Sequence, residues 1–145
     1  MQIRCPHCQK LNRLDESRIG DAPSCGACGK PLLNGVLSVD TAGLKALITQ
    51  PTLPLLVDFW APWCGPCRMF APTFEAAAKK HGQSIIFAKV DTEAEQAAGS
   101  AHNIRSIPTL AVFHRGQELG RVSGALPPAQ LEELVTKVLG QIAKS

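Results

Sequence analysis

The stretch that decides the fold reads VDFWAPWCGPC and covers residues 57–67. Its first part belongs to an apolar run, 53–60, that is typical of a central strand buried on both faces. Cys64 and Cys67 follow where a helix is expected to begin, at Pro66. Unpaired backbone N–H groups and the macrodipole at a helix N-terminus stabilise a thiolate, so Cys64 is the expected nucleophile. Cys67 lies nearly one turn later, close enough to form a disulfide, and is the expected resolving thiol.

On both sides of this stretch the chain alternates predicted strands and helices. N-terminal to it we predict a strand over 36–39 and a helix over 41–48, capped by Asp40 or Thr41. C-terminal to it we predict a helix over 66–81 kinked at Pro72, strands over 85–90 and 109–113, a helix over 93–102, and a hairpin turn at Arg115-Gly116 into a strand over 118–122. A final helix follows Pro127-Pro128, with apolar residues recurring at helical spacing from Leu131 to Ile142. This order predicts an α/β fold with a mixed central sheet flanked by helices.

Residues 1–34 form a different unit from residues 35–145, with 31–35 expected to be a linker. The N-terminal unit holds four of the six cysteines, in two Cys-x-x-Cys pairs separated by sixteen residues: Cys5, Cys8, Cys25 and Cys28. Four thiolates at this spacing predict one tetrahedral Zn²⁺ site, and the metal explains how a segment with so few large apolar residues folds. Two structural disulfides, four free thiols or an iron–sulfur cluster are the alternatives, and His7 is interpreted as a neighbour of the site.

Composition is that of a globular protein, with 45% hydrophobic and 19% charged residues among 145. The formal charge of +3 would fall to about +1 with a zinc ion on four thiolates. We therefore expect no nucleic-acid partner, which would need basic residues gathered on one face. The N-terminus has no apolar signal segment, and no run reaches membrane-spanning length. These features predict a cytoplasmic protein without a membrane partner.

Asp58 is the next informative residue, because an ionised carboxylate is costly to bury in an apolar strand. It is either a hydrogen-bonded structural group or a proton acceptor with a raised pKa beneath the cysteine pair. Lys89, in the neighbouring predicted strand, is its natural charge partner. Pro108 can simply start a strand, and Trp63 can be a core aromatic residue. We assign no role to the histidines at 81, 102 and 114.

At this point the residues resemble a known family. The motif over 57–68, with Ile107-Pro108-Thr109 and Gly124-Ala125, closely resembles thioredoxin from about residue 35 to the C-terminus. With the four-cysteine extension, the whole chain resembles the zinc-containing thioredoxin 2 type. The resemblance implies a thioredoxin fold with Pro108 in cis, and a buried acid–base pair of Asp58 and Lys89. It also implies a substrate groove formed by Trp63, Ile107, Pro108 and Gly124.

The activity that the resemblance implies is reduction of protein disulfides by the Cys64–Cys67 pair, which an NADPH-dependent thioredoxin reductase then restores. The protein is expected to act as a monomer, with a zinc site that is either structural or redox-sensitive. A zinc-ribbon binding module, for protein or nucleic acid, on a structural thioredoxin fold is the alternative from another class; an oxidase or isomerase is a third. His102 and Ser123 depart from the family pattern, which bears on partner preference.

Overall fold

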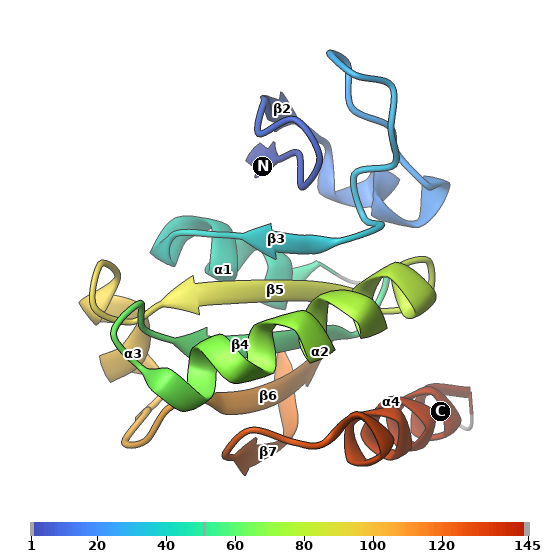
Figure 1. The fold of residues 1–145 in the computed structure, drawn as a ribbon. Coiled ribbons are helices and arrows are strands. Elements are labelled where there is room, and N and C mark those ends of the chain that lie inside the picture. The colour runs from blue at the N-terminus through green and yellow to red at the C-terminus, as the bar shows by residue number, and fades with distance from the viewer. Residues whose placement is uncertain (1, 51, 144–145) are drawn as a thin grey trace.

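The computed structural model describes residues 2–50 and 52–143, and its main body is a mixed sheet between two pairs of helices (Figure 1). The sheet has five strands in the order β3-β5-β4-β6-β7. Strands β3 and β4 run parallel to β5 between them, whereas β6 and β7 are antiparallel to their neighbours. The strands are β3 (Val36–Ser38), β4 (Leu55–Trp60), β5 (Ile86–Asp91), β6 (Thr109–His114) and β7 (Gln117–Ser123).

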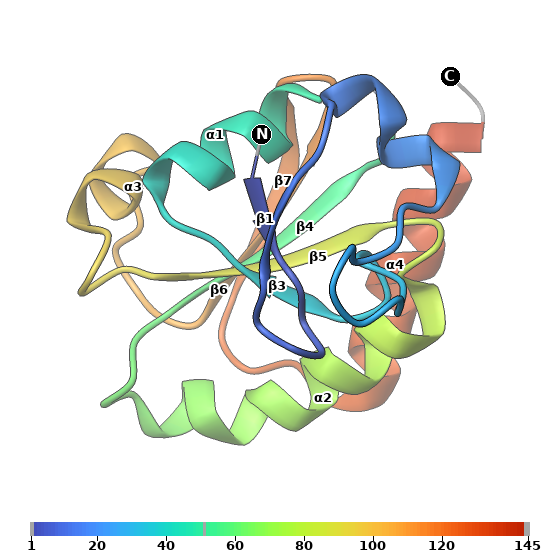
Figure 2. The same cartoon turned by 90° about the horizontal axis from the view of Figure 1, so that it is seen from above.

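Helices cover both faces of the sheet (Figure 2). One face is covered by α1 (Thr41–Thr49) and α3 (Gln96–Ala101), and the other by α2 (Gly65–His81) and α4 (Pro128–Ala143). The central strand β4 is buried on both sides, as the apolar run predicts. Leu55, Val57 and Phe59 join the core under α1 and α3, whereas Leu56 joins the core under α2 and α4. The predicted α/β architecture is confirmed.

The N-terminal unit is a small ribbon that lies over β3 and α1 (Figure 1). Its hairpin consists of β1 (Gln2–Arg4) and β2 (Leu11–Arg13), and a short 3-10 helix, η1 (Glu16–Asp21), follows. Its buried apolar side chains belong to the same core cluster as Leu37, Leu44 and Leu47 of the main body; they are Ile3, Leu14, Ile19, Leu32 and Leu33. The described part of the ribbon, residues 2–34, thus shares a core with the sheet.

The linker predicted over 31–35 is wrong in this respect. Leu32 is 2% and Leu33 4% exposed, and Pro31 forms an isolated bridge with Ser24. Gly35 lies so close to the ribbon that a Cβ there would meet Pro6 at 3.0 Å. The segment still connects the ribbon to β3, but burial of its two leucines anchors it in the core.

Most element boundaries lie within one residue of the prediction, and two differ by more. Helix α3 begins at Gln96 instead of residue 93, because the Asp91 carboxylate accepts the N–H groups of Glu93 and Ala94 and holds a turn there. Strand β4 begins at Leu55. The hairpin at Arg115-Gly116 is confirmed: both residues have positive φ, 53° and 82°, as two-residue hairpin turns require. Among residues 2–50 and 52–143, no helix is long and apolar enough to cross a membrane.

Candidate active site and metal centre

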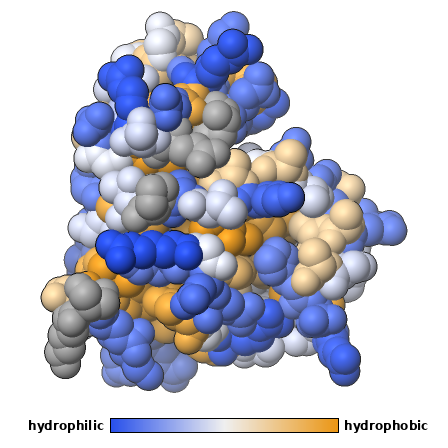
Figure 3. Space-filling view, turned by 180° about the vertical axis from the view of Figure 1, so that it is seen from behind, coloured by the Kyte–Doolittle hydropathy of each residue, from blue (hydrophilic) through white to orange (hydrophobic). Residues whose placement is uncertain are grey.

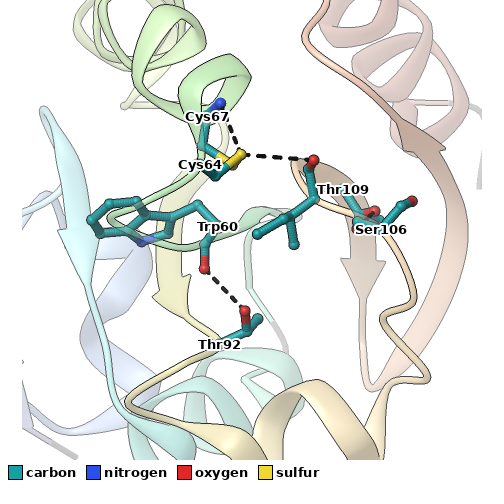
Figure 4. Close-up of a disulfide and its surroundings, with 7 residues drawn as sticks. Trp60, Cys64, Cys67, Thr92, Ser106 and Thr109 are labelled. Atoms are coloured by element: carbon teal, nitrogen blue, oxygen red, sulfur yellow. Dashed lines mark hydrogen bonds between the residues drawn. A yellow bond between two sulfur atoms is a disulfide. The ribbon is translucent and has the colours of Figure 1, made fainter.

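The two cysteines after β4 are joined by a disulfide at the start of α2, with their Cα atoms 5.2 Å apart. Cys64 is the N-cap residue of the helix, and its Sγ accepts the N–H of Cys67 at 3.2 Å. Both are buried, at 4% and 2% exposure, but the preceding Trp63 is 68% exposed. Figure 4 shows the pair at the start of the helix, near Trp60 and the segment from Ser106 to Thr109 that leads into β6. A cap sulfur that accepts backbone N–H groups is a stabilised thiolate when the pair is reduced.

The loop before β6 lies against the disulfide. Its Ile107–Pro108 peptide bond is cis, as the family resemblance implies. The Ile107 carbonyl oxygen lies 3.8 Å from Cys64 Sγ. Gly124, at a φ of 99°, donates its N–H to the Pro108 carbonyl at 2.8 Å. The predicted groove residues Ile107, Pro108 and Gly124 are therefore linked in space beside Cys64, and Trp63 precedes Cys64 directly in the chain.

Asp58 is a buried carboxyl group on the sheet face that α2 covers. Its side chain is 4% exposed, and its Oδ1 has no hydrogen-bond partner among residues 2–50 and 52–143. Burial raises the pKa of Asp58 to about 7, although the charge of Lys89 acts in the opposite direction. Lys89 stands opposite Asp58 in the parallel pair of β4 and β5, with its Nζ 5.1 Å from the centre of the Trp60 ring. The two residues of the expected charge pair thus stand opposite each other on neighbouring strands, and Asp58 Oδ1 lacks the hydrogen bond that a purely structural role would favour.

Several residues that hold this site in place were not predicted from the sequence. Thr92 donates its backbone N–H and its Oγ1 to the Trp60 carbonyl at 2.9 and 3.1 Å (Figure 4). Ser106 donates to Ser123 at 3.2 Å, and Thr109 Oγ1 donates to the Ser106 carbonyl at 2.6 Å. Ser106 and Thr109 both contact the Ser123 hydroxyl, at 3.2 and 3.4 Å, and so connect both ends of the cis-proline loop to β7. The only sequence signal was Ser123, which stands where the family commonly has an apolar residue.

The second site is the four-cysteine cluster in the ribbon. The sulfur atoms of Cys5, Cys8, Cys25 and Cys28 all lie within 4.8 Å of one another. Cys5 and Cys28 are 3.7 Å apart, and Cys8 and Cys25 are 3.6 Å apart. A tetrahedral zinc with bonds of about 2.3 Å separates its sulfur ligands by about 3.8 Å, so the cluster fits this ion. None of the four is in a disulfide, contrary to the structural-disulfide alternative.

Backbone N–H groups point at the two buried sulfurs of the cluster, as in metal knuckles. Cys5 Sγ accepts from His7 and Cys8, each at 3.4 Å, and Cys25 Sγ accepts from Ala27 at 3.3 Å. His7 therefore contributes its backbone, in agreement with its interpretation as a neighbour of the site. Hydrogen bonds lower the pKa of Cys25 to about 6; the Cys28 N–H has the largest effect and the Asn12 side chain the next largest. Asn12 was not predicted to belong to the site.

Together, a helix-capping cysteine in a disulfide, a cis-proline loop against it and a mixed sheet with helices on both faces define a thiol–disulfide oxidoreductase of the thioredoxin fold. Comparison with known proteins gives the family. The model described as Thioredoxin matches residues 35–137, and the one described as Thioredoxin 2, N-terminal, a zinc ribbon, matches residues 4–30. The chain belongs to the thioredoxin family, in its zinc-containing thioredoxin 2 type.

Individual relatives agree with this assignment. Thioredoxin C-3 of Corynebacterium nephridii is 39% identical over 142 residues, 97% of each chain. The thioredoxin of Porphyra purpurea is 41% identical over 104 residues, which are 72% of this chain and 97% of its own. Among solved structures, a thioredoxin mutant from Halobacterium salinarum has a TM-score of 0.65 at 31% identity, covering 72% of this chain and 91% of its own. The protein is thus a protein-disulfide oxidoreductase that uses a Cys-Gly-Pro-Cys dithiol, and the alternative of a binding module on an inert fold is not supported.

Proposed function

We propose that Cys64 is the nucleophile and Cys67 the resolving thiol in the reduction of protein disulfides. The Cys64 thiolate attacks one sulfur of the substrate disulfide, forms a mixed disulfide and releases the other substrate sulfur as a thiolate. Cys67 then loses its proton and attacks Cys64 Sγ. This step releases the second substrate thiolate and leaves the enzyme disulfide, so two electrons pass to the substrate. The observation that carries the assignment is the position of Cys64 at the helix cap, where its Sγ accepts the Cys67 N–H.

We further propose that Asp58 accepts the proton that Cys67 must lose, with Lys89 as its partner. A carboxyl group with a pKa of about 7 is divided between its two forms near neutral pH, which suits a group that takes up and returns a proton. Its face of β4 is covered by α2, the helix that carries Cys67. Its buried Oδ1 has no hydrogen-bond partner among the described residues, so this oxygen is available to accept the proton.

Substrate binding is proposed at the surface formed by Trp63, Ile107, Pro108 and Gly124. An extended peptide next to Cys64 would lie over the exposed indole and the cis-proline loop. Regeneration by an NADPH-dependent thioredoxin reductase is proposed from the family, which would place the protein in electron transport from NADPH to protein disulfides. We also propose a cytoplasmic location and a monomeric state for the reductase.

Zinc is proposed as the ion held by Cys5, Cys8, Cys25 and Cys28. When bound, it would offset two of the four thiolate charges and tie the two cysteine pairs together, which stabilises a segment with few large apolar residues. Residues 1–34 and 35–145 are proposed as the metal unit and the catalytic unit. Because Cys8 and Cys28 are exposed, peroxide or diamide would reach the cluster, convert thiolates to disulfides and release the metal. A chromogenic zinc assay during oxidant titration tests this redox-sensitive role; zinc retained until the protein unfolds would make the site purely structural.

Reduction of insulin by dithiothreitol tests the proposed assignment. The wild-type protein is expected to accelerate precipitation of the insulin B chain, and Cys64→Ser to be inactive. Cys67→Ser should accumulate as a covalent complex with the substrate, visible on a non-reducing gel and released by reductant. Normal turnover by Cys67→Ser would reverse the assignment of the two thiols.

A further inference from the structure

Asn12 makes an unusual set of contacts for a residue in a two-stranded hairpin. It lies in β2, after the first cysteine pair, and its side chain reaches the second pair. Its Oδ1 accepts the N–H of Gly26 at 2.9 Å. Its Nδ2 donates to Cys25 Sγ at 3.4 Å and to the Lys10 carbonyl at 3.0 Å. One amide thus uses both of its donor hydrogens and one acceptor position, and connects the two halves of the metal centre.

The two buried sulfurs of the cluster are supported differently. Cys5 accepts N–H groups from His7 and Cys8, both within its own knuckle. Cys25 accepts from Ala27, and the Cys28 N–H of its own knuckle also lowers the pKa of Cys25; one further bond comes from the Asn12 side chain of the other knuckle. Hydrogen bonds to a ligand sulfur fix its orientation and spread its negative charge, so these outer contacts contribute to metal affinity. Asn12 therefore adds a side-chain amide donor, which Cys5 does not have among the described residues, and this side chain also ties the two knuckles together.

We propose that Asn12 is a positioning residue of the metal centre, whose amide holds the Cys25 thiolate and the Gly26 backbone in the geometry that retains zinc. The inference rests on the proposed zinc site and deepens it. An amide is the required chemistry, since only a group that both donates and accepts makes these contacts. A carboxylate of the same shape would keep the bond from Gly26 but lose the donor to Cys25, and it would place a negative charge next to a thiolate.

The experiment measures zinc affinity by competition with the chelator 4-(2-pyridylazo)resorcinol in the full-length reduced protein. We expect Asn12→Ala to raise the zinc dissociation constant by about 10- to 100-fold, the range typical of lost outer contacts. Asn12→Asp should weaken zinc binding at least as much. Asn34→Ala, the same substitution at a residue outside the cluster, is the matched control and should stay within about twofold of wild type.

Cobalt(II) substitution supplies a second readout that a general loss of stability would not change. We expect the thiolate-to-cobalt charge-transfer band to shift in Asn12→Ala and Asn12→Asp and to stay in place in Asn34→Ala, because only the first two lose the donor to Cys25. If Asn12→Ala bound zinc with wild-type affinity and showed an unshifted band, the role of Asn12 would be overturned and the proposed zinc site would stand. Wild-type affinity in Asn12→Asp would also overturn that role, since the bond from Gly26 would then be sufficient. A wild-type protein that binds no zinc would overturn the proposed site as well.

Discussion

The ribbon and the active site use the same Cys-x-x-Cys spacing in opposite ways. In both ribbon knuckles the chain turns back after the second cysteine: Cys5 donates its N–H to Lys10 at 2.8 Å, and Cys25 donates to Lys30 at 2.9 Å. In the active site the chain continues as helix α2, from Gly65 to His81, and does not turn back. A knuckle directs two sulfurs outward to a shared ion, whereas a helix start directs one sulfur at the next. The backbone that follows the pair, and not the spacing, separates metal binding from redox catalysis.

The groups around the two sites differ in the same sense. Among the described residues, the group that could hold a metal consists of four cysteine sulfurs and includes no carboxylate or histidine. The active site has a buried carboxyl group, Asp58, whose pKa is raised by burial, and an exposed aromatic residue, Trp63, next to Cys64. Retaining a metal requires that thiolates stay unreactive, and reducing a disulfide requires that protons and substrate reach them.

The largest expected effect comes from replacing one cysteine by serine in each of the two sites. Cys64→Ser should abolish insulin reduction, because the nucleophile is lost. Cys8→Ser should abolish tight zinc binding and leave the catalytic dithiol reactive toward insulin. Activity and zinc content of the two variants, measured side by side, check the division of roles. Loss of both properties in Cys8→Ser would show that the metal centre is needed for catalysis.

Deletion of residues 1–34 tests the shared core. The remaining chain corresponds to relatives such as the Porphyra purpurea thioredoxin, which aligns over 97% of its own length. We therefore expect a folded and active reductase. It should lose stability, because Leu37, Leu44 and Leu47, each 1% exposed, lose their cover. Roughly 100–200 Å² of uncovered apolar surface at about 25 cal/mol per Å² corresponds to about 2.5–5 kcal/mol.

Urea unfolding of the truncated and full-length proteins, followed by insulin reduction, measures both expectations. Removal of zinc from the full-length protein is the matched arm, and a similar loss of stability is expected if the ribbon unfolds with the metal. A truncated chain that does not fold would mean that residues 1–34 and 35–145 are one unit.

The sequence predicted the parts of the molecule that depend on local pattern. Helix and strand order, the cap at Asp40 and the positions of the six cysteines follow from periodicity and motif. It did not predict that Leu32 and Leu33 join the main core, because burial of a turn-rich segment depends on what folds over it. The contacts of Asn12 were missed for the same reason: they join residues fourteen positions apart in sequence, through a side chain with no periodic signal.

Asp58 should make the free energy of unfolding of the protein depend on pH. Folding raises the pKa of this carboxyl from its ordinary 3.8 to about 7, so the folded protein binds a proton that the unfolded chain releases. The free energy of unfolding therefore falls as pH rises from about 4 to about 7. Relative to Asp58→Asn, wild type should lose roughly 2–3 kcal/mol between pH 5 and pH 8. Urea unfolding of both proteins at the two pH values is the measurement; parallel pH dependences would contradict the raised pKa.

The same variant tests the proposed proton transfer. Asp58→Asn should slow resolution of the mixed disulfide by about 10- to 100-fold at neutral pH, at the lower end of general-base effects because thiols ionise easily. Formation of the mixed disulfide, which depends on Cys64, should change little. Stopped-flow tryptophan fluorescence with a small disulfide substrate separates the two steps. Equal rates for variant and wild type across pH 6–9 would reduce Asp58 to a structural group.

The smallest expected effect concerns the equivalence of the two knuckles. Gln9 and Gly29 stand at matching positions, each donating its N–H to the carbonyl of the first cysteine of its pair. Both have positive φ, 68° and 76°, a region in which a side chain is strained. Gly29→Ala should destabilise the zinc-bound protein by about 1 kcal/mol. Gln9→Gly should be neutral or slightly stabilising.

Gly140→Ala is the control for this pair of variants. Gly29 and Gly140 both have open space where a Cβ would stand, but Gly140 lies in α4 without positive φ. Alanine there should stabilise the protein by up to about 1 kcal/mol, because glycine is a poor helix former. Thermal unfolding of the three zinc-loaded variants gives the comparison. If Gly29→Ala is as stable as wild type, the backbone of the knuckle accommodates alanine at no cost. The turn after the second cysteine would then not depend on a glycine at position 29. Opposite signs for Gly29→Ala and Gly140→Ala would show that backbone conformation alone sets the demand for glycine, since neither alanine meets a neighbouring atom.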